Sequence, residues 1–305
     1  MSNGASKFQN VRSLVTGVWL PIITPFVDGS VDFKSYERLL RYYLDQNIDG
    51  VIPLGTTGES ATIDDDEAAA IVELTVDVVD GRIPIYVGVG SNSTAKVVKS
   101  LKRLEQYSFA GILSVCPYYN RPSEEGIYQH FARVAECTDR NLLIYNIPYR
   151  TGVNLSNDAV LALSEIPNIV GIKDSSASMV QSMDLLRRRP AAFSVMTGED
   201  SLFYTMLALG GNGGILAAAH FRPAIFLEIY ERMAANDHRA ARAAWTTVEA
   251  TVPLFFKEPN PAPIKHWLWR KGLIQSPECR LPLTKVSTSL AKELDAVATD
   301  TPRAQ

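Results

Sequence analysis

Eight short apolar runs, each followed by a stretch with helical periodicity, alternate between residues 15 and 235 of the chain. Runs that are apolar throughout are typical of strands buried on both faces, as in a parallel sheet. Alternating strands and helices predict βαβ units. The predicted strands are VTGVWLPIIT (15–24), DGVIPLG (49–55), IPIYVGVG (83–90), AGILSVCP (110–117), LLIYNIP (142–148), IVGIK (169–173), FSVMTG (193–198) and GGILAAA (213–219). The predicted helices are Phe33–Gln46, Asp64–Val79, Ala95–Tyr107, Ser123–Thr138, Asn157–Leu163, Ser178–Arg189, Ser201–Leu209 and Pro223–Ala235.

These strand–helix pairs predict a (β/α)8 TIM barrel, an α/β fold of typically about 250 residues. A doubly wound sheet is the alternative, because periodicity alone does not show whether a sheet closes. Beyond Ala235 the patterns are helical only. The helices predicted there are His238–Phe256, Pro263–Lys271 and Ser287–Val297, with a Pro-rich turn, FKEPNPAP (256–263), after the first of them. We therefore predict a catalytic barrel over residues 13–236 and a small C-terminal helical domain over residues 237–305.

Composition excludes several classes of protein. The net charge is −3 and the pI is about 5.9, so we expect no nucleic-acid or anionic-membrane partner. Three cysteines without a CxxC pair indicate a reducing cytoplasm, and four scattered histidines give no metal-ligand spacing. The N-terminal sequence lacks the apolar stretch of a signal peptide, and no apolar run approaches the roughly 18 residues of a membrane span.

The predicted strand at 169–173 ends on a charged residue, Lys173. One interpretation is that the strand simply ends there and the ammonium reaches water. The other is that Lys173 lies in a pocket and acts as an amine. Lysine changes its pKa readily when it is buried, and a neutral amine can form a Schiff base.

Other unusual residues also follow predicted strands. These segments are GTTGES (55–60), PYYN (117–120), YNIPYRTG (145–152) and GED (198–200). In a barrel the chemistry lies at the carboxyl ends of the strands, so closure would bring these segments and Lys173 to one mouth. This coincidence favours the catalytic interpretation of the lysine.

Each segment has a chemical use and an ordinary alternative. The glycines of GTTGES expose backbone N–H groups, and Thr56 and Thr57 add hydroxyls, which suits a carboxylate or phosphate; the alternative is a plain βα turn. Tyr145 could move a proton and Arg150 could clamp a carboxylate, or they could be a core aromatic and a solvated charge. VGVGSNS (87–93) lacks the third glycine of a dinucleotide site.

Taken in order, GTTGES, PYYNRPS, YNIPYRTG, GIKD, GED and EPNPAPIK resemble the dihydrodipicolinate synthase family. That family is part of the wider N-acetylneuraminate lyase group of pyruvate-dependent Schiff-base barrels. The resemblance covers nearly the whole chain, from Ser13 to Lys285. It implies a (β/α)8 barrel with a C-terminal helical domain and a homotetramer built as a dimer of dimers. It also implies that neither a metal nor an organic cofactor is needed.

The resemblance implies a role for each site residue. Catalytic roles fall on Lys173, Tyr145, Thr57 and Tyr119, and substrate-binding roles fall on Thr56, Thr57, Arg150, Gly198 and Ile215. Lys173 would form the imine with pyruvate, Tyr145 and Thr57 would relay protons, and Tyr119 would be donated across a dimer interface. The donated tyrosine requires at least a dimer.

The implied reaction condenses pyruvate with L-aspartate-4-semialdehyde to give 4-hydroxy-tetrahydrodipicolinate. Arg150, which would hold the aldehyde's carboxylate, favours this reaction over the alternatives. Those are a 2-keto-3-deoxy sugar acid aldolase or dehydratase, a sialic-acid-type lyase, and a catalytically silent paralogue. Asp174 stands where synthases often carry glutamate. Tyr149 stands where a smaller residue is frequent, and its larger ring could narrow the acceptor site.

Feedback by lysine is predicted to be weak or absent. In lysine-inhibited members of the family an acidic residue binds the ammonium of the effector, and the resemblance places Lys96 at that position. The family's histidine contacts with the effector correspond to Asp65 and Ala68 here. A cation would therefore face a cation. Inhibition by sub-millimolar lysine would contradict this prediction.

Overall fold

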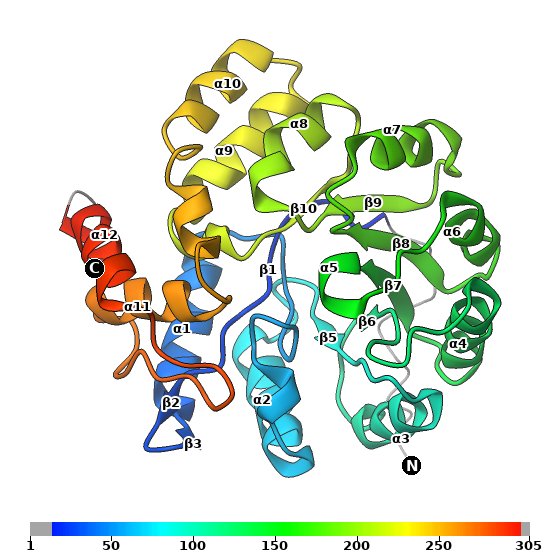
Figure 1. The fold of residues 1–305 in the computed structure, drawn as a ribbon, viewed down its shortest axis with the longest axis horizontal. Helices are drawn as coiled ribbons and strands as arrows, with labels where there is room; N and C mark the ends of the chain where they lie inside the picture. Colours follow the sequence, from blue (N-terminus) through cyan, green and yellow to red (C-terminus); the bar gives the residue numbers. More distant parts are fainter. Residues whose placement is uncertain (1–13, 300–305) are drawn as a thin grey trace.

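The computed structural model describes residues 14–299, and a parallel eight-stranded sheet forms its centre (Figure 1). Its strands follow the order β4-β1-β10-β9-β8-β7-β6-β5. Their bounds are β1 Gly17–Leu20, β4 Gly50–Val51, β5 Tyr86–Gly88, β6 Gly111–Val115, β7 Asn141–Asn146, β8 Ile169–Asp174, β9 Ser194–Thr197 and β10 Gly213–Ile215. A parallel bridge between Val51 and Ile85 joins the two ends of this order. The sheet therefore closes, which confirms the barrel and excludes the doubly wound alternative.

Helices surround the barrel, as Figure 1 shows. Their bounds are α1 Phe33–Asp45, α2 Asp65–Val79, α3 Thr94–Leu104, α4 Glu124–Glu136, α5 Pro148–Thr151, α6 Asn157–Ser164, α7 Met179–Arg188, α8 Phe203–Ala208 and α9 Pro223–Ala234. After the barrel come α10 His238–Thr246, α11 Ala262–Arg270 and α12 Thr288–Thr299. Each barrel helix predicted from periodicity is present, and α5 is an additional short turn. The division at residue 236 stays a prediction, and its outer limits, 13 and 305, lie outside the described residues.

The predicted helix 238–256 is wrong as a single element. The structure has α10 up to Thr246 and then a separate 3-10 helix, Val252–Phe256. Pro253 lies in this second segment and has no N–H to donate. Its ring would also clash with the preceding turn of a continuous α-helix, which explains the break.

A hairpin that was not predicted precedes α1. Strands β2 (Phe26–Val27) and β3 (Ser30–Val31) pair antiparallel. The turn between them is Asp28-Gly29, and both residues have positive φ, 50° and 78°. Asp-Gly is a favoured pair for the turn that matches the twist of two short strands. The sequence therefore carried a recognisable signal for this hairpin.

Two apolar clusters form the core. The larger one lies between the sheet and the helices that cover it, and the smaller one includes Trp19, Tyr86, Leu143, Tyr145, Met196 and Ile215, all from barrel strands. Within residues 14–299, no helix is long and apolar enough to cross a membrane.

Candidate active site

Lys173 is buried, with 6% of its surface exposed, and it lies on β8 beside Tyr145 of β7 and Met196 of β9. The interpretation that its ammonium reaches water is therefore wrong, and the strand runs one residue further, to Asp174. Gly198, directly after β9, makes room for it. A Cβ at Gly198 would lie 2.5 Å from Lys173 Cε, so a larger residue there would displace the lysine side chain.

The surroundings of Lys173 favour a neutral amine. Burial lowers the pKa of Lys173 to about 8, and the charge of Arg150 lowers it further, while Asp200 and Glu199 oppose the shift. At pH 7 a group with this pKa is neutral in about a tenth of the molecules, far more than an ordinary lysine. The Nζ atom lies 4.3 Å from the centre of the Tyr145 ring.

The side chain next to this amine is the phenol of Tyr145. Burial raises its pKa to about 12, which the charge of Arg150 and the side chains of Ser175 and Thr56 partly offset. The phenol is therefore protonated at neutral pH and can donate a proton to a developing negative charge. Its contact in the GTTGES turn is with Thr56.

Thr57 has a different partner from Thr56. Its buried hydroxyl accepts a 2.9 Å hydrogen bond from Asn260 Nδ2, which comes from the Pro-rich turn 203 residues later in the chain. The motif EPNPAPIK includes Asn260, but sequence reasoning gave this residue no role. The structure thus gives the two threonines separate neighbours.

Two acidic residues follow β9. Asp200 is buried and accepts a 2.6 Å hydrogen bond from the backbone N–H of Ala218, which ties together the loops after β9 and β10. Burial raises the pKa of Asp200 to about 7, and that of half-buried Glu199 is also raised by burial. The sequence marked GED as a segment at the barrel mouth without naming these carboxylates as site residues.

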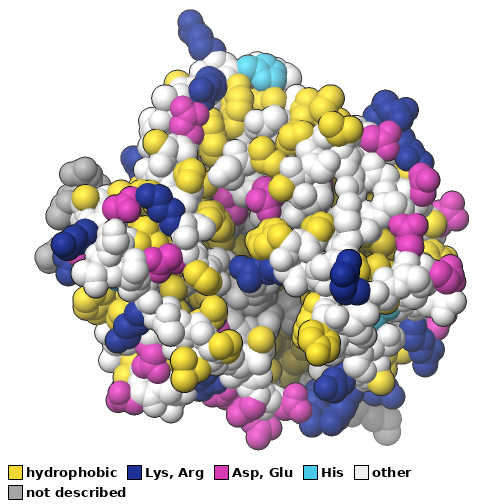
Figure 2. All heavy atoms as spheres, viewed as in Figure 1, with side chains coloured by type: hydrophobic (Ala, Val, Ile, Leu, Met, Phe, Trp, Pro, Cys, Tyr) yellow, Lys and Arg dark blue, Asp and Glu magenta, His cyan; other side chains and the backbone are white. Residues whose placement is uncertain are grey.

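A small cavity of about 20 Å³ joins these groups. It is lined by Thr56, Thr57, Tyr145, Tyr149, Arg150, Lys173, Gly198, Asp200, Ile215, Ala217, Phe256 and Asn260. It opens into an outer cleft of about 910 Å³, and Figure 2 shows this face hollowed near its centre, with basic and acidic side chains around the hollow. Tyr149 is exposed and lines both spaces, with the guanidinium of Arg150 5.4 Å from its ring centre.

The structure brings together every predicted site residue except Tyr119. That residue is 89% exposed and does not line the cavity within this chain. Its backbone has positive φ, 75°, so it lies in a turn rather than on a continuing strand. Within residues 14–299, no three His, Cys, Asp or Glu side chains cluster in a way that could hold a metal ion.

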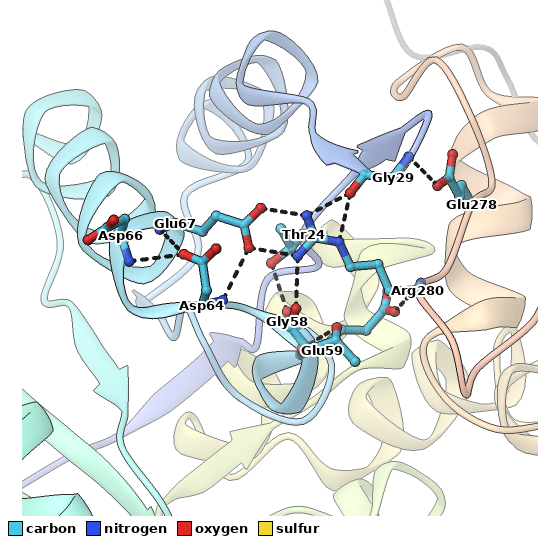
Figure 3. A network of polar contacts seen from close by, with 10 residues as sticks. Thr24, Gly29, Gly58, Glu59, Asp64, Asp66, Glu67, Glu278 and Arg280 are labelled. Carbon is cyan, nitrogen blue, oxygen red and sulfur yellow. Dashed lines mark hydrogen bonds and ion pairs between the residues drawn. The ribbon is translucent and has the colours of Figure 1, made fainter.

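The C-terminal segment holds the GTTGES turn in place through contacts with Glu59. Glu59 forms a fully buried ion pair with Lys265 of α11 and accepts a 3.0 Å hydrogen bond from the backbone N–H of Arg280. The Arg280 side chain continues to Glu67 of α2 and to the carbonyl oxygen of Gly29 in the hairpin, as Figure 3 shows. The segment after the barrel therefore fixes the turn that carries Thr56 and Thr57.

The geometry agrees with comparisons to known proteins. A model of the Dihydrodipicolinate synthetase family matches residues 14–301. The chain belongs to this family. A relative from Clostridium acetobutylicum named 4-hydroxy-tetrahydrodipicolinate synthase 2 is 48% identical over 281 residues, which cover 92% of this chain and 98% of the relative. A 4-hydroxy-tetrahydrodipicolinate synthase from an Azoarcus strain is 39% identical, over 90% of this chain and 94% of its own length.

Solved structures of family members share the fold. Dihydrodipicolinate synthase from Thermotoga maritima superposes with a TM-score of 0.92 at 35% identity and covers 94% of this chain and 99% of its own. A dihydrodipicolinate synthase variant described as monomeric gives a TM-score of 0.91 at 35% identity, over 93% and 96% of the two chains. The resemblance found in the motifs therefore extends over the whole barrel.

Proposed function

We propose that the chain is a lyase, 4-hydroxy-tetrahydrodipicolinate synthase, which condenses pyruvate with L-aspartate-4-semialdehyde. The observation that carries this proposal is the buried Lys173, whose pKa is lowered to about 8, beside Tyr145 in a cavity with Arg150 at its opening. The curated relatives with this name support it. The product belongs to the biosynthesis of diaminopimelate and lysine.

The first half of the reaction is imine formation. The neutral amine of Lys173 attacks the ketone carbon of pyruvate, and loss of water leaves a protonated imine. The imine draws electrons from the neighbouring methyl group, so a C3 proton can leave and an enamine forms. Gly198 and Ile215 line the cavity beside the lysine, where the small keto acid would bind.

Tyr145 is proposed to carry protons in both halves, with Thr56 as its partner. The family resemblance implied the relay role for Thr57, but the contact of Tyr145 in this turn is with Thr56, and the hydroxyl of Thr57 accepts a hydrogen bond from Asn260. We therefore place Thr56 in the relay and keep Thr57 as a wall of the pyruvate site. Tyr119 would join the relay from a partner subunit.

The second half adds the aldehyde. The enamine carbon attacks the aldehyde carbon of L-aspartate-4-semialdehyde, and the resulting alkoxide takes a proton. The amino group of the adduct then displaces Lys173 from the imine carbon, which closes the ring and frees the enzyme. Arg150 lies where the inner cavity meets the outer cleft, and its guanidinium suits the carboxylate of this substrate.

Self-association as a homotetramer in the cytoplasm is part of the proposal. The exposed Tyr119 requires a second subunit if it is to reach a cavity. Helix α7 also presents two exposed apolar side chains, Val180 at 81% and Met183 at 52%. Neighbouring apolar residues on a surface helix are typical of subunit contacts.

The test is pyruvate-dependent consumption of L-aspartate-4-semialdehyde by the purified protein, coupled to a reductase that uses the cyclic product. We expect turnover in the ordinary enzyme range of roughly 1–10³ s⁻¹. No turnover from folded protein that still forms the pyruvate imine would overturn the acceptor assignment. The site would then serve a keto-deoxy acid, with Arg150 holding a different carboxylate.

A further inference from the structure

Asn260 lies where the inner cavity opens into the outer cleft. It lines both spaces, as Arg150 does, although it is only 9% exposed. It comes from the turn between the 3-10 helix Val252–Phe256 and α11, so its side chain enters the barrel mouth from outside the barrel. A molecule that passes from the cleft to Lys173 therefore passes Asn260.

The two ends of the Asn260 amide are in different situations. Nδ2 donates to Thr57 Oγ1 at 2.9 Å. Oδ1 is buried and has no hydrogen-bond partner among residues 14–299. Buried polar atoms in folded proteins nearly always have a partner. Because Asn260 itself lines the cavity, its free acceptor points to a donor that a bound ligand supplies.

We propose that Asn260 Oδ1 accepts a hydrogen bond from the α-ammonium of the acceptor aldehyde while Arg150 holds its carboxylate. Asn260 would thereby select amino-acid aldehydes over acceptors that lack the amino group. The inference rests on the proposed function, because it names the group by which that site recognises its second substrate. The ammonium and carboxylate of L-aspartate-4-semialdehyde share one carbon, so their binding groups must lie at the same level of the cavity. Both residues lie at the junction of cavity and cleft.

Glu199 is the competing group, because a carboxylate could also bind an ammonium. It is half-buried near Lys173 and Arg150, and both of these cations lower its pKa against the effect of burial. Its charge therefore already faces two positive groups. Asn260 Oδ1 is the acceptor that has no partner among the described residues.

The experiment compares the substrate with a probe that lacks only the amino group. The KM of L-aspartate-4-semialdehyde is measured at saturating pyruvate, together with the inhibition constant of 4-oxobutanoate as a competitor. In Asn260→Ala we expect the KM to rise about 10- to 100-fold, as for a lost hydrogen bond from a charged donor. The inhibition constant of 4-oxobutanoate should not change. Asn260→Asp, which keeps an acceptor oxygen, should retain the low KM.

Two results would overturn the inference while leaving the proposed function intact. Equal weakening of both aldehydes in Asn260→Ala would mean that Asn260 acts only through Thr57. A rise in the KM of the amino aldehyde in Glu199→Gln, without one in Asn260→Ala, would assign the ammonium to Glu199. Reduction of the pyruvate imine by borohydride serves as the folding control in every variant. Failure of the wild-type protein to consume the amino aldehyde would overturn both the proposed function and this inference.

Discussion

Lys173 and Lys265 are both buried, with 6% and 0% of their surfaces exposed, yet their surroundings differ in kind. Lys265 is paired with Glu59, donates a 2.8 Å hydrogen bond to the carbonyl oxygen of Glu278, and lies 4.1 Å from the centre of the Phe26 ring. Among residues 14–299, Lys173 Nζ has no hydrogen bond or ion pair, and it faces a cavity. Burial lowers the pKa of both amines, so burial alone does not make a nucleophile.

The difference separates a structural lysine from a reactive one. A buried amine that already donates to fixed partners is held as a cation and has no space for a second reactant. A buried amine without such partners, beside a cavity and a hydroxyl, can lose its proton and attack a ketone. The predictions below test this division, beginning with the largest expected effect.

The largest effect is expected from Lys173→Ala. Removing the nucleophile should lower kcat in the coupled synthase assay by about 10⁴-fold or more, because covalent catalysis has no substitute for the amine. The circular dichroism spectrum and unfolding midpoint should stay close to those of the wild type. Persistent full turnover would remove Lys173 from the mechanism.

Lys265→Met should affect stability instead. Breaking a buried ion pair costs about 3–5 kcal/mol, since it leaves Glu59 charged and unpaired. Urea unfolding should show this loss, while folded protein at low temperature should still form an imine at Lys173. Adding Glu59→Gln should recover part of the loss, because the amide oxygen can still accept from the Arg280 backbone. A stable Lys265→Met that no longer forms an imine would break the division between the two lysines.

Tyr145→Phe tests the hydroxyl of the tyrosine beside the reactive lysine. Loss of a positioned proton donor should lower kcat by about 10²- to 10⁴-fold. The matched control is Tyr86→Phe. Tyr86 belongs to the same inner apolar cluster but does not line the cavity. Equal losses in both variants would indicate damage to barrel packing rather than a proton-transfer role.

The smallest effect is a pH dependence. Imine formation needs the neutral amine, so its rate constant should rise with pH and level off above the folded-state pKa of Lys173, about 8. An ordinary lysine would keep gaining reactivity up to about pH 10.4. The measurement is the rate of irreversible inactivation by pyruvate and borohydride from pH 6 to 9. A rate that still rises tenfold per pH unit at pH 9 would contradict the lowered pKa.

Much of the architecture could be predicted from local patterns. Continuous apolar runs gave all eight barrel strands, and the helices that follow them were placed to within a few residues. The single helix expected over 238–256 was wrong because a proline outweighed an otherwise helical pattern. The β2–β3 hairpin was missed, although its Asp-Gly turn is a local signal.

The site was predicted as a set of residues but not as a set of contacts. Strand ends placed Lys173, Tyr145 and Arg150 at one mouth, since a barrel brings such ends together. The hydrogen bond from Asn260 to Thr57 spans 203 residues, and no local pattern fixes which of two adjacent threonines Asn260 reaches. The separate neighbours of Thr56 and Thr57 therefore required the three-dimensional structure.

The most direct test of the central claim is to locate the imine. Wild-type protein is incubated with pyruvate, reduced with borohydride, digested and mapped by mass spectrometry. The account predicts one stable pyruvate-derived adduct, on the peptide that contains Lys173, and an unmodified Lys265 in the same sample. An adduct on a different lysine, or none on folded protein, would contradict the assignment of Lys173 as the reactive amine.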